Sequence, residues 1–226
     1  MIDVACIGAH PDDVEIGMGG TVAGLVRRGR SVAIIDLTDG EPTPQGTRET
    51  RMREAARAAE ILGVERRTLS QPNRYLFDTV EARIELAEVL RDLRPGTLFV
   101  PYAEDSHPDH VAAHAIAIAA RFYAKFTKTE MAGEPHYPAR VYQYMAVHQK
   151  ILRDPSFVVD ISADLDTKVM ALGAYESQFS ANPANAGLIQ RVEQDSRMWG
   201  AQVRAEAGEP FYALEAVGVR EVESLM

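Results

Sequence analysis

The sequence predicts an α/β protein with a Rossmann-like, mainly parallel β-sheet that carries helices on both faces. Short apolar runs alternate along the chain with longer segments in which apolar residues recur at helical spacing. The runs are almost wholly apolar, which is typical of strands buried on both faces of a parallel sheet. Loops rich in glycine and proline separate them. We therefore expect a single domain over residues 1–226.

The first half of the chain predicts strands that alternate with helices. Gly29 and Gly63 stop the first two helices, and Arg94-Pro95-Gly96 stops the third. The glycine-rich residues 17–21 predict a turn into the first helix and close packing of that helix near the site. In chain order the elements are strand 4–7, helix 21–28, strand 31–37, helix 49–62, strand 67–69, helix 80–93 and strand 97–101.

The second half begins with an alanine-rich helix and then mixes strands and helices. Polar and apolar residues alternate in the first of its strands, and the second is a short apolar run. The expected elements are helix 111–126, strand 140–147, strand 157–161, helix 164–177 and helix 188–200. The polar loop 182–187 is a candidate lid.

The composition argues against several classes of function. With 24 basic and 33 acidic residues, the formal net charge is −9, the wrong sign for a general binder of nucleic acids or anionic membranes. No apolar run is long enough for a membrane span, and the N-terminus does not resemble a signal peptide. The single cysteine, Cys6, lies in the first strand, so we expect an inert buried thiol and a reducing compartment. The sequence predicts a cytoplasmic protein.

Two short polar motifs follow predicted buried strands. Ala9-His10-Pro11-Asp12-Asp13 comes after strand 4–7, and His107-Pro108-Asp109-His110 comes after strand 97–101. The carboxyl ends of parallel strands meet at one edge of the sheet, where open α/β sheets bind ligands. Two histidines and a carboxylate are a common zinc ligand set that leaves a position open for water. We therefore predict that His10, Asp13 and His110 bind one metal ion.

The other residues of the two motifs suit hydrolysis of an amide or ester. Asp12, beside the predicted metal, could take a proton from water as a general base. His107 could protonate a leaving group or steady an oxyanion, and Asp109 could orient His107 or a ligand histidine. Arg51 lies near the start of a predicted helix, where its guanidinium could hold a substrate carboxylate or phosphate.

Each of these features also has a structural alternative. Either motif alone could be a turn with an aspartate N-cap, and arginines on a helix face are usually solvated. His114 could be a fourth ligand, but we expect it to lie on the helix face or behind the ligands. His136 and His148 have no carboxylate neighbours in the sequence, so we expect structural roles for both.

The two motifs together resemble those of a known family. The segment from Ala9 to Asp13, with Glu15 and Gly17, followed by the segment from His107 to His110, is similar to the PIG-L/LmbE-like zinc-dependent N-acetylglucosaminyl deacetylases. The resemblance runs over nearly the whole chain. It implies a Rossmann-like fold and removal of the acetyl group from an N-acetylglucosamine conjugate.

Position by position, the resemblance implies the same site. It makes Asp12 the general base, His107 the residue that stabilises the oxyanion or protonates the amine, and Asp109 the support of His107. Relatives have a substrate-binding arginine at the position of Arg51. The implied cofactor is Zn²⁺, although Fe²⁺ suits the same donors. The implied metal ligands are His10, Asp13 and His110.

Within the family, the resemblance is greatest to the bacillithiol-pathway branch. Gly46-Thr47 with Arg51, and the segment from Ala174 to Phe179, carry it. Enzymes of this branch deacetylate N-acetylglucosaminyl malate, and relatives form hexamers. Some have an arginine directly before the second motif, where this chain has Ser106, so Arg51 would hold the malate alone. We therefore expect a homo-oligomer, with a hexamer implied, that acts on a small amino-sugar conjugate.

Three alternatives to this function stay open. The substrate could be another amino-sugar conjugate, such as an inositol glycoside or a chitooligosaccharide. A nucleotide-binding Rossmann module would use the glycines at 17–20, but these do not fit the G-x-G-x-x-G frame. A noncatalytic sugar- or metal-binding protein would keep the metal ligands without needing Asp12 or His107.

Overall fold

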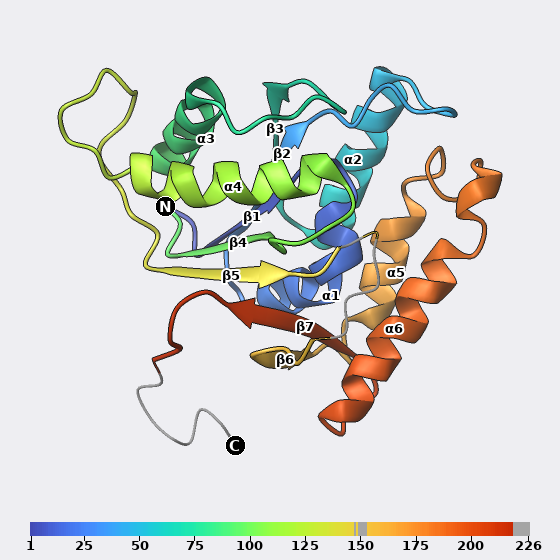
Figure 1. Ribbon diagram of the computed structural model, residues 1–226. Coiled ribbons are helices and arrows are strands. Elements are labelled where there is room, and N and C mark those ends of the chain that lie inside the picture. The colour runs from blue at the N-terminus through green and yellow to red at the C-terminus, as the bar shows by residue number, and fades with distance from the viewer. Residues whose placement is uncertain (147, 149–152, 219–226) are drawn as a thin grey trace.

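The computed structural model describes residues 1–146, 148 and 153–218, and within them seven strands form one sheet with helices on both faces (Figure 1). The strands are β1 (Val4–Gly8), β2 (Val32–Thr38), β3 (Glu65–Gln71), β4 (Thr97–Pro101), β5 (Arg140–Tyr144), β6 (Phe157–Asp160) and β7 (Gly208–Ala213). The helices are α1 (Asp13–Arg27), α2 (Arg48–Leu62), α3 (Val80–Leu93), α4 (Pro108–Tyr123), α5 (Leu165–Gly173), the short 3₁₀ helix η1 (Pro183–Asn185) and α6 (Leu188–Gln202). This architecture confirms the predicted fold class.

The order of the strands, β3-β2-β1-β4-β5-β7-β6, places the ends of β1 and β4 side by side. β1 pairs in parallel with both β2 and β4, and parallel pairing continues outward to β3 and β5. β7 runs antiparallel to its neighbours β5 and β6. The chain winds from β1 to one side and later returns to β4 on the other. Such a switch in winding direction opens a crevice at the carboxyl ends of the strands.

The sheet has a hydrophobic core on each face. Alternate residues of a strand point to opposite faces, so Val4 and Cys6 of β1 pack in one core while Ala5 and Ile7 pack in the other. The first core lies under α1, α2 and α5, and the second lies under α3 and α4. Cys6 is fully buried, and burial raises the pKa of its thiol, as expected of an inert cysteine.

Helix α1 starts at Asp13, the last residue of the first motif, so the turn predicted at 17–21 is wrong. The glycines lie inside the helix because neighbouring side chains leave no room for a Cβ atom. A Cβ on Gly17 would overlap the ring of Tyr144, and one on Gly20 would lie 2.6 Å from Cδ1 of Ile161. The helical geometry is interrupted at Met18, after which the carboxylate of Glu209 accepts the N–H groups of the next turn. The close packing predicted for these glycines is confirmed.

The other predicted elements match the observed ones within a few residues, with two notable differences. The helix predicted over 111–126 begins earlier, at Pro108, because proline suits a first helical turn and the His107 side chain caps it. The sequence does not predict β7, whose Glu209 and Pro210 interrupt its apolar character. The last residue of the predicted strand 140–147 lies outside the described residues. In the described part of the chain, no helix is both long enough and apolar enough to cross a membrane.

Candidate metal centre

The two motifs meet where β1 and β4 end. His10 and Asp12 lie in the turn after β1, Asp13 is the first residue of α1, and the second motif forms the start of α4. The ring centroid of His10 lies 4.9 Å from that of His107 and 5.3 Å from that of His110. Side chains 99 positions apart in the chain, those of His10 and Asp109, are in contact. The strand order therefore gathers both motifs into one site.

His10, Asp13 and His110 form a compact group of side chains able to ligate a metal. All three are buried, and the ligand atoms they offer lie within 4.8 Å of one another. Asp13 stands between the histidines: its Oδ2 is 3.6 Å from Nδ1 of His10, and its Oδ1 is 3.3 Å from Nε2 of His110. His10, His107 and Asp109 form a second group of this kind. The two groups share His10.

Within the group of His10, Asp13 and His110, one buried atom lacks a hydrogen-bond partner among the described residues, namely Nε2 of His110. The other ring nitrogen, Nδ1, lies 2.6 Å from Oδ2 of Asp105. When Nδ1 donates its proton to that carboxylate, Nε2 presents a free lone pair beside Asp13. A cation held by Nε2, Asp13 and His10 would satisfy this lone pair, and the donor types are those that zinc prefers. The residues present therefore fit a divalent metal ion.

Carboxylates around His10 and His110 favour positive charge at this site. Burial lowers the pKa of His10, but hydrogen bonds with Asp109 and Asp13 outweigh burial and raise the pKa to about 9. Burial also lowers the pKa of His110, yet the charge of Asp13 and the contact with Asp105 raise it to about 10. Burial raises the pKa of Asp13, but the charge of His110 outweighs it and holds the pKa well below its usual value. The centre therefore stabilises a cation.

Asp105, which the sequence analysis did not single out, holds His110 in place. Its Oδ2 bonds with Nδ1 of His110, and its Oδ1 accepts the backbone N–H groups of His107 at 3.2 Å and His148 at 3.0 Å. Burial raises the pKa of Asp105, but these bonds outweigh it and lower the pKa to about 2. The only signal in the sequence is an aspartate in the loop before the second motif, and such residues are usually solvated.

Asp109 supports His10 through its carboxylate. Its Oδ2 lies 3.1 Å from Nε2 of His10. The same carboxylate accepts the backbone N–H groups of Arg74 at 2.7 Å and Leu76 at 3.4 Å, both in the loop between β3 and α3. Of the two partners that the sequence suggested for Asp109, the ligand histidine is therefore the one that this carboxylate contacts.

His107 is the N-cap of α4 and stacks on His110. Its Nδ1 accepts the backbone N–H of Asp109 at 3.2 Å, and its ring lies 4.7 Å from that of His110 with 14° between the planes. Burial and the charges of His110 and His10 lower the pKa of His107 to about 4, so its imidazole is neutral. Because Nδ1 accepts a hydrogen bond, the ring proton lies on Nε2. His107 can therefore donate one hydrogen bond from Nε2.

The remaining histidines fall into two groups. The ring of His148 lies 5.2 Å from that of His107 and 5.3 Å from that of His110, so sequence reasoning missed its place at the site. His114 and His136 bond instead to the backbone carbonyls of Pro101 and Pro95, at 2.9 and 2.8 Å. These two histidines occupy structural positions, as the sequence analysis expected.

Asp12 has an unusual backbone conformation. Its φ of 112° and ψ of −22° lie in a region that residues other than glycine seldom adopt. Its Oδ2 accepts a hydrogen bond from Nη2 of Arg51 at 3.0 Å. Burial raises the pKa of Asp12 to about 7, Arg51 opposes this shift and Asp13 adds to it. Unfavourable backbone geometry persists where the surroundings enforce it, and it clusters at functional sites.

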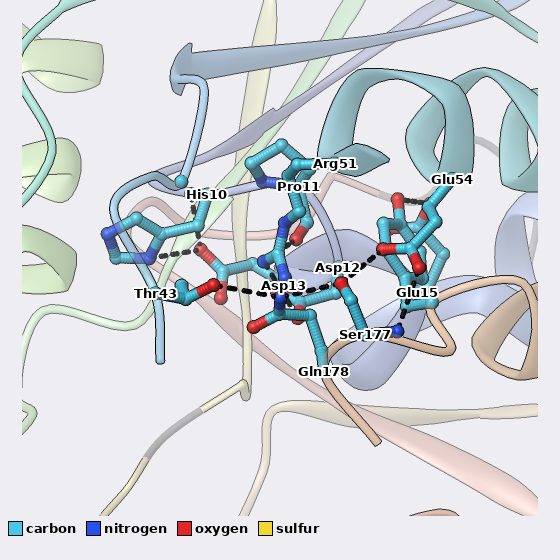
Figure 2. Close-up of polar contacts among 12 residues, drawn as sticks. His10, Pro11, Asp12, Asp13, Glu15, Thr43, Arg51, Glu54, Ser177 and Gln178 are labelled. Atoms are coloured by element: carbon cyan, nitrogen blue, oxygen red, sulfur yellow. Dashed lines mark hydrogen bonds and ion pairs between the residues drawn. The ribbon is translucent and has the colours of Figure 1, made fainter. Parts of the chain in front are cut away.

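Arg51 lies buried over Pro11 and Asp12 (Figure 2). Its Nη2 donates to the carbonyl of Pro11 as well as to Asp12, and its guanidinium carbon lies 5.4 Å from the centre of the Tyr175 ring. Its Nε and Nη1 have no hydrogen-bond partner among the described residues. Arg51 therefore fixes Asp12 with one nitrogen and retains two donors for another group.

A buried network behind Asp12 joins α1 to β2 and β3. Arg66 of β3 donates to Asp36 of β2 from Nε at 2.6 Å and from Nη2 at 2.9 Å, and to Glu15 of α1 from Nη1 at 2.6 Å. The hydroxyl of Tyr175 donates to the same oxygen of Glu15 at 2.8 Å. Glu15, Asp36 and Tyr175 are fully buried. The network holds the start of α1, from which Asp13 reaches the metal centre.

The loop after α5 is tied to α2 beside the site. Ser177 donates to Glu54 from its N–H at 2.8 Å and from its hydroxyl at 2.6 Å, and the amide of Gln178 donates to the hydroxyl of Thr43 at 3.2 Å (Figure 2). Asn185, in the predicted lid 182–187, donates to the carbonyl of Gln178 at 2.8 Å. The candidate lid is therefore anchored to the loop that packs on α2.

Comparisons of sequence find relatives among deacetylases. The family model described as PIG-L, GlcNAc-PI de-N-acetylase, matches residues 5–121. A diacetylchitobiose deacetylase from Thermococcus kodakarensis is 35% identical over 195 residues, which cover 78% of this chain and 70% of the relative. The 1D-myo-inositol 2-acetamido-2-deoxy-alpha-D-glucopyranoside deacetylase 2 of Catenulispora acidiphila is 28% identical, over 92% of this chain and 86% of that protein.

A comparison of structure finds the same fold over almost the whole chain. The crystal structure of the conserved protein TT1542 from Thermus thermophilus matches with a TM-score of 0.89 and 39% sequence identity. The match covers 97% of each chain. The described fold is therefore shared with an experimentally determined structure.

Proposed function

The chain belongs to the PIG-L family of GlcNAc-PI de-N-acetylases and is an enzyme of the GlcNAc deacetylase type, and on this premise we propose that it hydrolyses the N-acetyl group of a small N-acetylglucosamine conjugate at the centre formed by His10, Asp13 and His110. The observation that carries this proposal is the buried Nε2 of His110, which faces Asp13 and has no hydrogen-bond partner in the described part of the chain. The proposed domain is the single unit 1–226.

The proposed metal ligands are His10, Asp13 and His110. A divalent ion bound there supplies a water of lowered pKa and polarises the acetamide carbonyl. We propose Zn²⁺, with Fe²⁺ as the alternative in the cell, since histidine and aspartate accept both. Asp105 and Asp109 orient the two ligand histidines through the nitrogens that face away from Asp13.

Asp12 is the proposed general base. It adjoins the ligand Asp13, and Arg51 occupies its Oδ2, which leaves Oδ1 to accept a proton from the attacking water. The water oxygen then bonds to the acetamide carbon. As the C–N bond breaks, Asp12 returns the proton to the amide nitrogen, and the products are acetate and the free amine.

His107 is the proposed stabiliser of the oxyanion. Its Nε2–H can donate to the carbonyl oxygen while negative charge develops there. Its Nδ1 already accepts the N–H of Asp109, so the ring in this arrangement has no second proton to give. This geometry favours the oxyanion role of His107 over the acid role, and it supports Asp12 as the group that protonates the amine.

Three kinds of conjugate are candidates for the part of the substrate beyond the sugar. N-acetylglucosaminyl malate, the substrate in bacillithiol biosynthesis, is supported by Nε and Nη1 of Arg51, which have no hydrogen-bond partner within the described part of the chain, because a guanidinium binds carboxylates. A chitooligosaccharide and an inositol glycoside are supported by the relatives from Thermococcus kodakarensis and Catenulispora acidiphila. We further propose a cytoplasmic homo-oligomer, with a hexamer as the expected form, which light scattering of the purified protein tests.

A panel of substrates tests the proposed activity. We expect the metal-loaded protein to release free amine from at least one of N-acetylglucosaminyl malate, the inositol conjugate and diacetylchitobiose. A chelator is expected to abolish this release, and Zn²⁺ but not Mg²⁺ is expected to restore it, because His and Asp donors favour zinc. A metal-loaded protein that binds these conjugates and frees no amine would instead be a noncatalytic binding protein.

Replacing Asp105 by alanine is expected to weaken metal binding about 10- to 100-fold. The variant removes the carboxylate that fixes the ring of His110, so Nε2 no longer faces Asp13 in one orientation. The affinity of Asp105→Asn for Zn²⁺ should lie between those of wild type and Asp105→Ala, because the asparagine amide oxygen still accepts a hydrogen bond from Nδ1–H of His110. Calorimetric titration of the metal-free protein with Zn²⁺ measures the affinities.

The matched control for Asp105 is Glu104→Ala. Glu104 is an exposed carboxylate one residue away, and it pairs with the exposed Arg153. We expect its loss to leave the affinity for Zn²⁺ unchanged. An Asp105→Ala variant that keeps its fold and binds Zn²⁺ as tightly as wild type would rule out the orienting role.

A further inference from the structure

The loop between β3 and α3, residues 72–79, carries two exposed aromatic side chains. Tyr75 is 69% exposed and Phe77 is 67% exposed, whereas Leu76 between them is 3% exposed and packs in the core under α3 and α4. A single exposed apolar side chain is common on protein surfaces and needs no explanation. Two exposed aromatic rings on either side of a buried leucine form an apolar patch on a backbone that the leucine holds in place. The loop that carries these rings contacts Asp109, and this contact indicates that the rings lie near bound substrate.

This loop is attached directly to the metal centre. The N–H groups of Arg74 and Leu76 donate to the carboxylate of Asp109, which also contacts Nε2 of His10. Tyr75 therefore lies between two backbone groups that are linked to the ligand His10 through a single carboxylate. Figure 1 shows the loop between β3 and α3 beside the start of α4, where the second motif lies.

The core beneath the loop fixes the backbone that carries the two rings. Leu76 is buried, Arg74 has a left-handed φ of 68°, and the side chain of Thr79 caps α3 directly after Phe77. An anchored aromatic ring binds at low entropic cost, because it has few rotamers to lose. The faces of pyranose and cyclitol rings carry C–H groups, which pack on aromatic faces as other apolar groups do.

We propose that Tyr75 and Phe77 form a platform for the second ring of the substrate, the sugar or cyclitol attached to the N-acetylglucosamine that is deacetylated. This inference rests on the proposed function and deepens it, because it selects a ring-bearing conjugate over the malate conjugate. A carboxylate needs hydrogen-bond donors or positive charge, and an aromatic face supplies neither. Tyr75 and Phe77 are thus specificity-determining residues at the rim of the site.

Two substrates that differ by one ring test the platform. Diacetylchitobiose carries the second ring, and N-acetylglucosamine does not. For Tyr75→Ser and for Phe77→Ser, we expect KM for diacetylchitobiose to rise roughly three- to tenfold, since an aromatic contact contributes about 0.5–1.5 kcal/mol. The kinetic constants for N-acetylglucosamine should stay within about twofold of wild type. Tyr75→Phe keeps the ring and should behave as wild type.

The matched control is Phe122→Ser. Phe122 is 50% exposed, but it lies near the far end of α4, roughly 18 Å along the helix from His110 at 1.5 Å per residue. Its loss should leave both substrates unaffected. Calorimetric binding of glucosaminyl-N-acetylglucosamine, the product that has lost one acetyl group, gives a second readout that needs no turnover, and both serine variants should weaken it.

Every other outcome contradicts either the proposed role of Tyr75 and Phe77 or the proposed deacetylase activity, and the measurements distinguish these two cases. Equal changes in KM for both substrates, or no change for either, would overturn the platform while the enzyme still deacetylates. Serine variants that alter the oligomeric state without altering the preference for diacetylchitobiose would also overturn it, and would assign the rings to a subunit contact. If no conjugate is deacetylated, the proposed function fails, and binding of glucosaminyl-N-acetylglucosamine still decides the platform.

Discussion

Replacing Asp12 by asparagine is expected to lower kcat at least a hundredfold, the scale of general base catalysis, while metal affinity and fold are retained. Asparagine cannot take a proton from water, but its amide oxygen can still accept the hydrogen bond from Arg51. The choice of asparagine follows from the backbone, because Asp12 has a φ of 112° and asparagine tolerates positive φ better than alanine. Steady-state kinetics with calorimetric Zn²⁺ titration measures both quantities.

A glycine variant controls for the backbone at this position. Asp12→Gly removes the carboxylate and relieves the unusual conformation, so we expect it to fold and to be as inactive as Asp12→Asn. Asp39→Asn is the matched control for charge. Asp39 lies in the loop after β2, pairs with Arg48 at the start of α2, and has no proposed role in proton transfer. Normal turnover by a metal-loaded Asp12→Asn protein would exclude Asp12 as the base.

Apart from Arg51, the site residues that sequence reasoning found lie in the two motifs, because each motif is continuous in the chain. Asp105 and His148 were missed for a physical reason. Asp105 acts through contacts with three separate backbone and ring groups, and His148 approaches from a segment after β5. Asp105 lies two and five residues before its partners His107 and His110, but it stands in a loop without a periodic pattern that could reveal these contacts. His148 lies 43 residues after Asp105, and only the order of the strands brings it to the site.

The fold shows the same limit. Strands such as β2 and β4 are predictable because burial on both faces demands a mostly apolar run, which in β2 only Asp36 and Thr38 interrupt. In the sequence, Gly17 and Gly20 are typical of a turn, yet both lie in α1. Glycine is required at these positions because the side chains of Tyr144 and Ile161 approach the helix backbone closely. A helix that has glycine where its neighbours pack closely lacks the periodic apolar side chains by which helices are recognised in a sequence.

Replacing Arg66 by methionine is expected to destabilise the fold by about 3–5 kcal/mol, because it leaves two buried carboxylates without their partner. Arg66 makes three hydrogen bonds to Asp36 and Glu15, and all three side chains are nearly or fully inaccessible to solvent. Chemical denaturation by urea measures the loss. Adding Asp36→Asn to this variant should recover part of it, since one buried charge is then removed.

Arg67→Met provides the matched control, one residue further along the same strand. Arg67 also pairs with two carboxylates, Glu65 and Asp92, but its side chain is 33% exposed, so its loss should cost less than about 1 kcal/mol. Burial raises the pKa of Asp36, and Arg66 opposes that shift. Without Arg66 the native pKa of Asp36 rises further above its unfolded value, so the deficit of Arg66→Met should grow as the pH rises above that unfolded value. Equal losses for the two variants, or a deficit that shrinks as the pH rises, would show that the burial of this network contributes nothing to the fold.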